Sequence, residues 1–247
     1  MNEKGQVTIF IIVGLVIIFG VIIYLSARGN IQKSNVLNKD PSQELLNIVQ
    51  DCLKETGEEV LTTVGEQGGY NIIVEDISSI DGRLPYYIKD KTNLMPSKEI
   101  IASHVAGLIQ ARLPFCVMDF KTYIDNNPDF SINHTLKKVY TSFVKEKVVI
   151  KADYLISISK ENDTETIKEI KVEIPFNFNE IYRKINKTTQ MLLTYSPEIC
   201  LSCLYELGEQ EKMYIELLPY SNSTIVTLID KDILLNDKEY TWSFAIK

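Results

Sequence analysis

The chain has 247 residues, of which 33 are acidic and 26 are Lys or Arg, so its formal net charge at pH 7 is −7. This acidic balance, with no basic stripe along the sequence, argues against a protein that binds the phosphates of nucleic acids. The sequence has two histidines and no HExxH, GxSxG or EF-hand spacing. We therefore expect no enzymatic activity, no metal site and no cofactor.

The N-terminal region carries the strongest signal in the sequence. Residues 7–25 are 19 consecutive residues without a charged side chain. As a helix this run would be about 28 Å long, close to the thickness of the apolar core of a bilayer, and it is longer than the core of a cleavable export signal. The sequence predicts a short cytoplasmic tail or leader over 1–6, a transmembrane helix over 7–27 and a linker over 28–39, with the lipid bilayer as one partner.

A short motif, KGQVT at residues 4–8, stands at the start of the apolar run. This motif resembles the leader of archaeal type IV prepilins that carry a class III signal peptide. The resemblance implies cleavage between Gly5 and Gln6 and assembly with other pilin-like subunits through the apolar helix. The sequence departs from that family at Phe10, where those prepilins have the Glu that pairs with the amine of the neighbouring subunit.

The opening KGQVTIFII is followed, in this order along the chain, by four further segments: VQDCLKE, EQGGY, MPSKEI and LPFC. Together they resemble a group of uncharacterised membrane-anchored archaeal proteins. That group has no assigned chemistry, so the resemblance implies only an architecture and a location.

Four Asn-x-Ser/Thr sequons lie after the apolar run, and none has Pro in the middle position. Because N-glycosylation acts on the exported side of a membrane, the sequons favour a body that lies outside the cell. The basic residues on the two sides of the apolar run do not decide its orientation. The candidate acceptors are Asn133, Asn162, Asn186 and Asn222.

The four cysteines are Cys52, Cys116, Cys200 and Cys203. In an exported body this even number predicts two disulfides, with three possible connectivities. We favour Cys52–Cys116, because each residue lies on or beside an amphipathic helix, which leaves the CxxC pair as the second disulfide. Two alternatives remain open for that pair. A redox site needs a helix N-terminus after a strand, and a zinc site usually needs a second close pair of cysteines.

Residues 40–247 predict a single α+β domain that begins with two helices. Asp40 suits the cap of the first helix, Pro41 its first position, and Gln43 completes a capping box. Apolar residues recur at three- and four-residue steps up to the glycines that begin at Gly65. We expect this helix to end there.

A second helix begins after Ser97, and Pro114 is expected to end it near Cys116. Between the two helices we expect a short strand at 71–74 and an irregular segment at 76–93. This segment contains two adjacent tyrosines, and exposed tyrosines in a loop can bind sugars or other proteins. The candidate partner-binding residues are Tyr86 and Tyr87.

The second half of the chain changes to a period of two. Apolar and polar residues alternate within 139–158 and within 167–175, with a turn at 161–163, which predicts an antiparallel sheet with one wet face. A third helix follows at 179–193. Further strands are expected at 214–218, 225–229 and 240–246.

Taken together, these patterns predict a single-pass membrane protein whose domain lies outside the cell and has a structural or interaction role. Its partners would be the lipid bilayer and other cell-surface proteins. Two alternatives remain open: a pilin-like subunit that assembles through its N-terminal helix, and an anchored extracytoplasmic enzyme or solute-binding domain.

Overall fold

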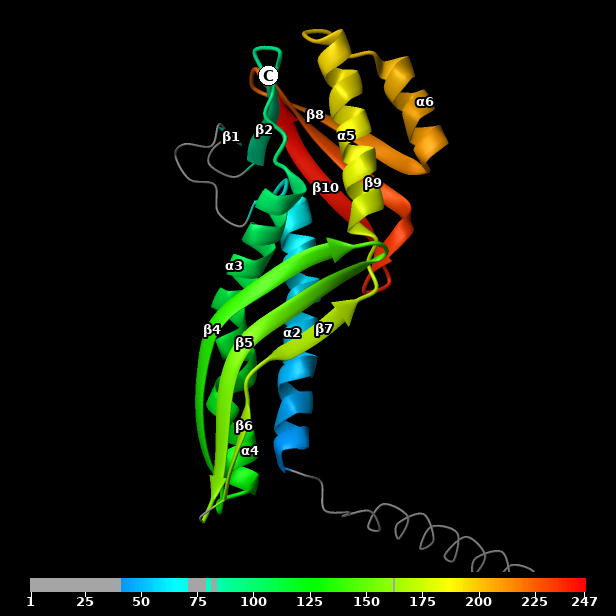
Figure 1. Cartoon of the computed structure of the whole chain (residues 1–247). Coiled ribbons are helices and arrows are strands. Elements are labelled where there is room, and N and C mark those ends of the chain that lie inside the picture. Colours follow the sequence, from blue (N-terminus) through cyan, green and yellow to red (C-terminus); the bar gives the residue numbers. More distant parts are fainter. Residues whose placement is uncertain (1–40, 71–78, 81–83, 162) are drawn as a thin grey trace, which may run out of the picture. The chain divides into compact units, whose positions relative to one another are not determined.

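The computed structural model describes residues 41–70, 79–80, 84–161 and 163–247 (Figure 1). The predicted leader, transmembrane helix and linker, and the predicted strand at 71–74, lie outside the described residues. Helices and mainly antiparallel strands make up the described part, which confirms the α+β class. The contacts group residues 41–247 into one unit.

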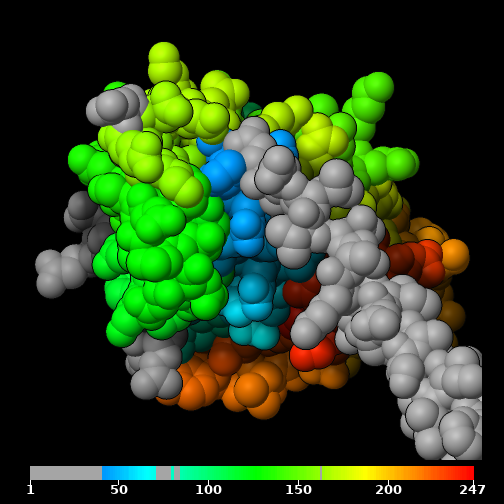
Figure 2. Space-filling model, turned by 90° about the horizontal axis from the view of Figure 1, so that it is seen from below, coloured from blue at the N-terminus to red at the C-terminus, as the bar shows by residue number. Residues whose placement is uncertain are grey.

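Helix α2 spans Pro41–Glu66, which confirms the first predicted helix. It contacts α3 and strands of two separate sheets, β7 and β10. In Figure 2 the residues of α2 (blue to cyan) lie between green residues and the red residues near the C-terminus. At two glycines of α2, side chains of the two sheets lie close to the helix backbone. A Cβ atom on Gly57 would lie 2.5 Å from the side chain of Ile150, and one on Gly65 would lie 2.5 Å from Oη of Tyr240.

Helix α3 spans Lys98–Val117 and begins as predicted, because the side chain of Ser97 accepts a hydrogen bond from the backbone N–H of Ile100. The helix continues through Pro114 and ends at Val117, one residue beyond the predicted end near Cys116. Proline removes the hydrogen bond that its own N–H would donate, but its C=O still accepts the N–H of Met118, which closes the helix. A 3-10 turn, η1 (Met118–Phe120), and helix α4 (Lys121–Asn126) follow.

The segment Lys98–Asn126 is long and apolar enough to cross a membrane, and within the described ranges it is the one segment that meets this criterion. In the structure it comprises α3, η1 and α4. One face of α3 belongs to the core, where the helix contacts α2 and β4, whereas Ile100, Phe115 and Met118 are exposed. We therefore interpret it as a core helix of the domain.

One sheet has four antiparallel strands: β4 (Ser131–Val144), β5 (Lys147–Lys160), β6 (Asp163–Ile167) and β7 (Ile170–Ile174). β4 pairs along one edge of β5, while β6 and β7 share the other edge, opposite residues 156–160 and 148–152 respectively. Every second residue of β5 from Val148 to Ile158 is buried. The predicted alternation is confirmed, but β4 begins eight residues earlier than expected.

The second sheet has the order β1-β2-β10-β9-β8, with β3 beside β2, so the single predicted sheet is in fact two. Its strands are β1 (Ser79–Ile80), β2 (Leu84–Lys89), β3 (Thr92–Asn93), β8 (Met213–Tyr220), β9 (Ser223–Leu235) and β10 (Lys238–Ile246). The irregular segment expected at 76–93 is wrong, because β2 is a strand that pairs in parallel with the end of β10.

Two helices, α5 (Phe178–Tyr195) and α6 (Leu201–Glu211), lie beside this second sheet (Figure 1). α5 is the predicted third helix, capped by the Asn177 side chain, which accepts the N–H of Glu180. α6 was not expected. Leu204, Leu207 and Gly208 are its buried residues.

Candidate functional site

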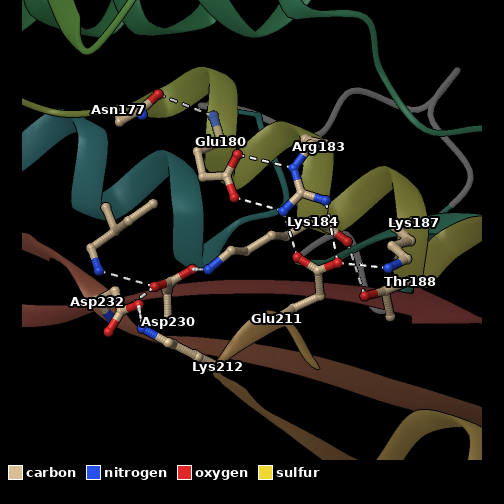
Figure 3. Close-up of polar contacts among 11 residues, drawn as sticks. Asn177, Glu180, Arg183, Lys184, Lys187, Thr188, Glu211, Lys212, Asp230 and Asp232 are labelled. Atoms are coloured by element: carbon tan, nitrogen blue, oxygen red, sulfur yellow. Dashed lines mark hydrogen bonds and ion pairs between the residues drawn. The ribbon is translucent and has the colours of Figure 1, made fainter. Parts of the chain in front are cut away.

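A cluster of charged side chains joins α5, α6 and the second sheet (Figure 3). Glu211 accepts hydrogen bonds from Arg183 and from Lys187, and Arg183 also binds Glu180. The hydrogen bond from Arg183 lowers the pKa of Glu211 to about 2, although burial acts in the opposite direction. Because each of these carboxylates has a cationic partner, the cluster holds α5 against α6 and offers no free acid or base for chemistry.

The most buried pair of this cluster is Lys184 with Asp230, whose side-chain atoms lie 2.6 Å apart (Figure 3). The cavity beside them has a volume of about 10 Å³, which is too small for a substrate. We interpret the pair as a structural contact between α5 and β9.

The histidines have structural surroundings. His104 packs against the ring of Tyr70, and burial lowers its pKa. His134 lies 3.0 Å from the hydroxyl of Tyr154 and 3.5 Å from the carboxylate of Asp119. Burial raises the pKa of Tyr154 to about 12, and its side chain is almost completely covered, so no substrate reaches it. Within the ranges that the structure covers, no three His, Cys, Asp or Glu residues are grouped as metal ligands.

All four cysteines form disulfides, in the pairing that the sequence favoured. Cys52 in α2 is bonded to Cys116 in α3, with their Cα atoms 5.7 Å apart. Cys200 is bonded to Cys203 at the start of α6, with their Cα atoms 5.3 Å apart. The first disulfide ties the two N-terminal helices of the domain together.

The sequons occupy different surroundings. Asn133 is exposed on β4, Asn186 is exposed on α5, and Asn222 is exposed in the turn between β8 and β9. The hydroxyl of Thr188, which completes the sequon of Asn186, is buried and donates to the C=O of Lys184. Asn162 lies outside the described residues.

The tyrosine pair does not form one binding surface. Tyr87 is fully buried, its ring stacks on Phe244, and its hydroxyl donates to the C=O of Gly68 and accepts from Trp242. The expectation that Tyr87 contacts a partner is therefore wrong, because side chains of a strand alternate between two faces. Tyr86 is half-buried, with its hydroxyl 2.8 Å from that of Ser223.

A groove with a volume of about 630 Å³ lies between α3 and β4. Its β4 side is made by the consecutive residues 138–143. Side chains of a strand alternate, so consecutive residues line a cavity where the backbone edge of the strand faces it. The residues on the α3 side are Lys98, Glu99, Ala102, Ser103, Ala106, Gly107 and Gln110.

The edge of β4 that faces the groove is unpaired. Among the described strands β4 pairs with β5 alone, and the N–H of Val139 donates to Oε1 of Gln110 at 3.1 Å. Alternate residues of an antiparallel strand direct their N–H and C=O groups to the same edge, so those of Thr141 and Phe143 also face away from β5. The buried hydroxyl of Thr141 has no hydrogen-bond partner in the described part of the chain either.

The fold and this groove define an α+β domain with a disulfide-linked helix pair and an open sheet edge beside a helix. Comparisons of the chain with protein-family models, with curated proteins and with solved structures found no match. The groove was missed at the sequence level, because Gln110 and Val139 belong to different elements and no local pattern marks a strand edge.

Proposed function

We propose that the chain is a single-pass membrane-anchored protein whose domain lies outside the cell and binds an extended polypeptide segment in the groove between α3 and β4. The interaction role rests on one observation, the unpaired edge of β4 opposite a helix with small side chains. An extended segment offers the alternating N–H and C=O groups that such an edge can pair with.

Gln110 supports this class of ligand. Its side-chain carboxamide has the same hydrogen-bonding groups as a peptide unit, and it already accepts the N–H of Val139. Farther along the same edge, Thr141 and Phe143 have no such substitute in the described residues. Ala102 and Gly107 leave room on the helix side for a backbone to come close.

The charges around the groove favour a neutral or acidic ligand. Lys98 and Lys138 line it against the single carboxylate of Glu99. The ammonium of Lys138 also lies 5.1 Å above the ring of Tyr140, which keeps its charge beside the strand edge. A basic segment would meet repulsion from both lysines.

The binding role is tested with the full-length protein in detergent micelles and a phage-displayed library of 12-residue peptides. Selected peptides should lose at least tenfold in affinity when every second amide is N-methylated, and little when the alternate amides are. Gly107→Trp, which fills the groove, should weaken binding at least tenfold. Ala111→Trp, four residues along the same helix at an exposed position outside the groove, is the control. If neither the methylation pattern nor Gly107→Trp changes the affinity for the peptides, the binding role is refuted.

The location is supported by the apolar run at residues 7–25 and by the pairing of all four cysteines. In intact cells an added protease should digest the domain. An alkylating reagent should label its four cysteines only after the disulfides have been reduced. A soluble cytosolic protein with four free thiols would contradict the location without bearing on the groove.

A second candidate, a pilin-like subunit, is favoured by the KGQ motif at residues 4–6. Mass spectrometry of the native N-terminus distinguishes the two candidates. A chain that begins at Gln6 indicates processing by a prepilin peptidase, and a chain that keeps its first five residues indicates a permanent anchor.

A further inference from the structure

The disulfide Cys200–Cys203 lies at the N-terminus of an 11-residue helix. Cys200 is the N-cap residue of α6, and its Sγ accepts a hydrogen bond from the backbone N–H of Cys203 at 3.3 Å. The hydroxyl of Ser202 lies 3.6 Å from the same sulfur. The pair therefore lies at a helix N-terminus, as a redox site requires, but α6 follows a helix and not a strand.

A helix N-terminus stabilises a thiolate, because its first N–H groups have no acceptor within the helix and the helix dipole places partial positive charge there. Between residues 196 and 204 the one charged side chain is that of Glu198, so basic neighbours in the sequence do not contribute. The backbone N–H of Cys203 donates directly to Sγ of Cys200 and would stabilise a negative charge on that sulfur. Cys200 is therefore the sulfur of the pair that is better suited to leave as a thiolate.

A cleft lies beside the segment that precedes this disulfide, although neither cysteine lines it. The segment 196–199, which leads directly into Cys200, forms one wall of a cavity of about 330 Å³. Leu192 of α5, the turn between β8 and β9, and the end of β10 form the other walls. The cleft therefore ends one residue before Cys200 in the sequence.

Two large apolar side chains are exposed at the start of α6, one turn apart. Leu201 is 67% exposed and Tyr205 is 71% exposed, and residues four apart are neighbours on the surface of a helix. Such side chains have no role in the core of the domain. Next to a half-exposed disulfide, they form an apolar surface on which a partner chain can dock.

The second disulfide of the chain provides an internal comparison. Cys52 is 9% exposed and belongs to the core cluster between α2 and α3. Neither of its sulfurs caps a helix, and Cys116 lies near the C-terminal end of α3. Cys116 is partly exposed, so the two disulfides differ in the burial of Cys52 and in the helix N-terminus that only Cys200 caps.

From these contacts we propose that Cys200–Cys203 is a thiol–disulfide exchange site that oxidises a dithiol in a partner polypeptide. A thiolate of the partner attacks Sγ of Cys203, the disulfide bond breaks, and its electron pair remains on Cys200, which takes up a proton. The second partner thiolate then attacks its own sulfur in the mixed disulfide and expels Cys203, which is protonated in turn. The partner loses two electrons and two protons to form its disulfide, and the chain gains both as two thiols.

The test uses the full-length oxidised protein and a 12-residue peptide that contains one reduced Cys-x-x-Cys dithiol. The protein should oxidise one equivalent of peptide, and peptide mapping should locate the new thiols at Cys200 and Cys203, with Cys52–Cys116 intact. In the single variants the thiol left in Cys203→Ser should react with iodoacetamide at pH 7 at least tenfold faster than the thiol left in Cys200→Ser.

Docking is tested separately from simple lability of the disulfide. Leu201→Ser combined with Tyr205→Ser should slow oxidation of the peptide at least fivefold and leave reduction by dithiothreitol unchanged. Tyr214→Ser, which changes another exposed tyrosine on β8, is the matched control and should alter neither rate.

Three results would overturn the proposal: equal alkylation rates for the two single variants, reduction of Cys52–Cys116 at the same rate as Cys200–Cys203, or equal slowing of the peptide and dithiothreitol reactions. None of these measurements depends on the peptide groove or on the membrane location. Failure here is therefore distinguishable from failure of the proposed function.

Discussion

Nζ of Lys184 on α5 lies 2.6 Å from Oδ2 of Asp230 on β9, and less than a tenth of either side chain is exposed. The other carboxylate oxygen, Oδ1, accepts the backbone N–H groups of Asp232 and Ile233 at 3.0 and 2.9 Å. Within the described part of the chain, Asp230 thus has three donors, while the ammonium of Lys184 has this one carboxylate. The two members of the pair do not depend on each other equally.

This asymmetry predicts unequal effects of removing either charge. Asp230→Asn leaves a buried ammonium without a counter-charge and should lower the free energy of unfolding by about 3–5 kcal/mol. Lys184→Met should lower it less, because the carboxylate keeps its two backbone donors. Urea unfolding of both variants measures the difference. A larger loss for Lys184→Met would contradict this account of the pair.

Acid should destabilise the domain partly through Glu211. Its folded pKa is about 2, below its usual value of 4.5, so its contribution is complete above pH 4.5 and is lost as the pH falls toward 2. Glu211→Gln should therefore reduce the slope of stability against pH in that window, as measured by thermal unfolding.

Glu173 is the matched control for this prediction. Its pKa is also about 2, because Lys147 and Lys171 both donate to it. Its side chain is 41% exposed, against 9% for Glu211, so water and salt screen its ion pairs more strongly. Glu173→Gln should change the slope less than Glu211→Gln, and an equal or larger change would disprove the assignment.

The two disulfides should differ in their effect on stability. Cys52 and Cys116 are 64 residues apart in sequence, and Cys200 and Cys203 are three apart. Closing the longer loop removes more freedom from the unfolded chain, by about 4 kcal/mol against about 1.5–2 kcal/mol in the chain-entropy estimate. Cys52→Ser with Cys116→Ser should therefore lower the unfolding midpoint in guanidinium more than Cys200→Ser with Cys203→Ser. The reverse order would show that α6 depends on its disulfide for folding.

Gly65 should not tolerate a methyl group. A Cβ atom there would lie 2.5 Å from Oη of Tyr240 and 2.6 Å from the backbone oxygen of Thr241, and the Tyr240 hydroxyl already donates to the C=O of Leu61. Gly65→Ala should destabilise the domain by about 1–3 kcal/mol, as overpacking does. Gly107→Ala, at an exposed position of α3, should instead stabilise it by about 0.5–1 kcal/mol. Differential scanning calorimetry compares the two, and stabilisation by both would rule out the clash at Gly65.

Local signals were sufficient for the elements that carry their own caps and periodicity. Pro41 and Ser97 marked the starts of α2 and α3, and alternation marked β5. The start of α6 was missed, because its cap is the sulfur of Cys200 and not one of the oxygen side chains that usually cap helices.

Strand β2 was missed for a different reason. Pro85 interrupts its sequence, and the strand is held by pairing of Tyr86 with Ala245, far away in the chain. Long-range pairing of this kind leaves no local periodicity. The same limit applies to the groove, since the sequence does not state that β4 is an edge strand, and to the division of the strands between two sheets.

The covalent link between Cys52 and Cys116 also has a mechanical consequence. A pulling force applied at Pro41 can unwind α2 only as far as Cys52, after which tension passes through the sulfur bridge into α3 and bypasses the intervening residues. Eleven residues drawn straight extend by about 40 Å at most. The domain therefore has a short, defined tether length under load, and reduction of this one bond would lengthen it severalfold.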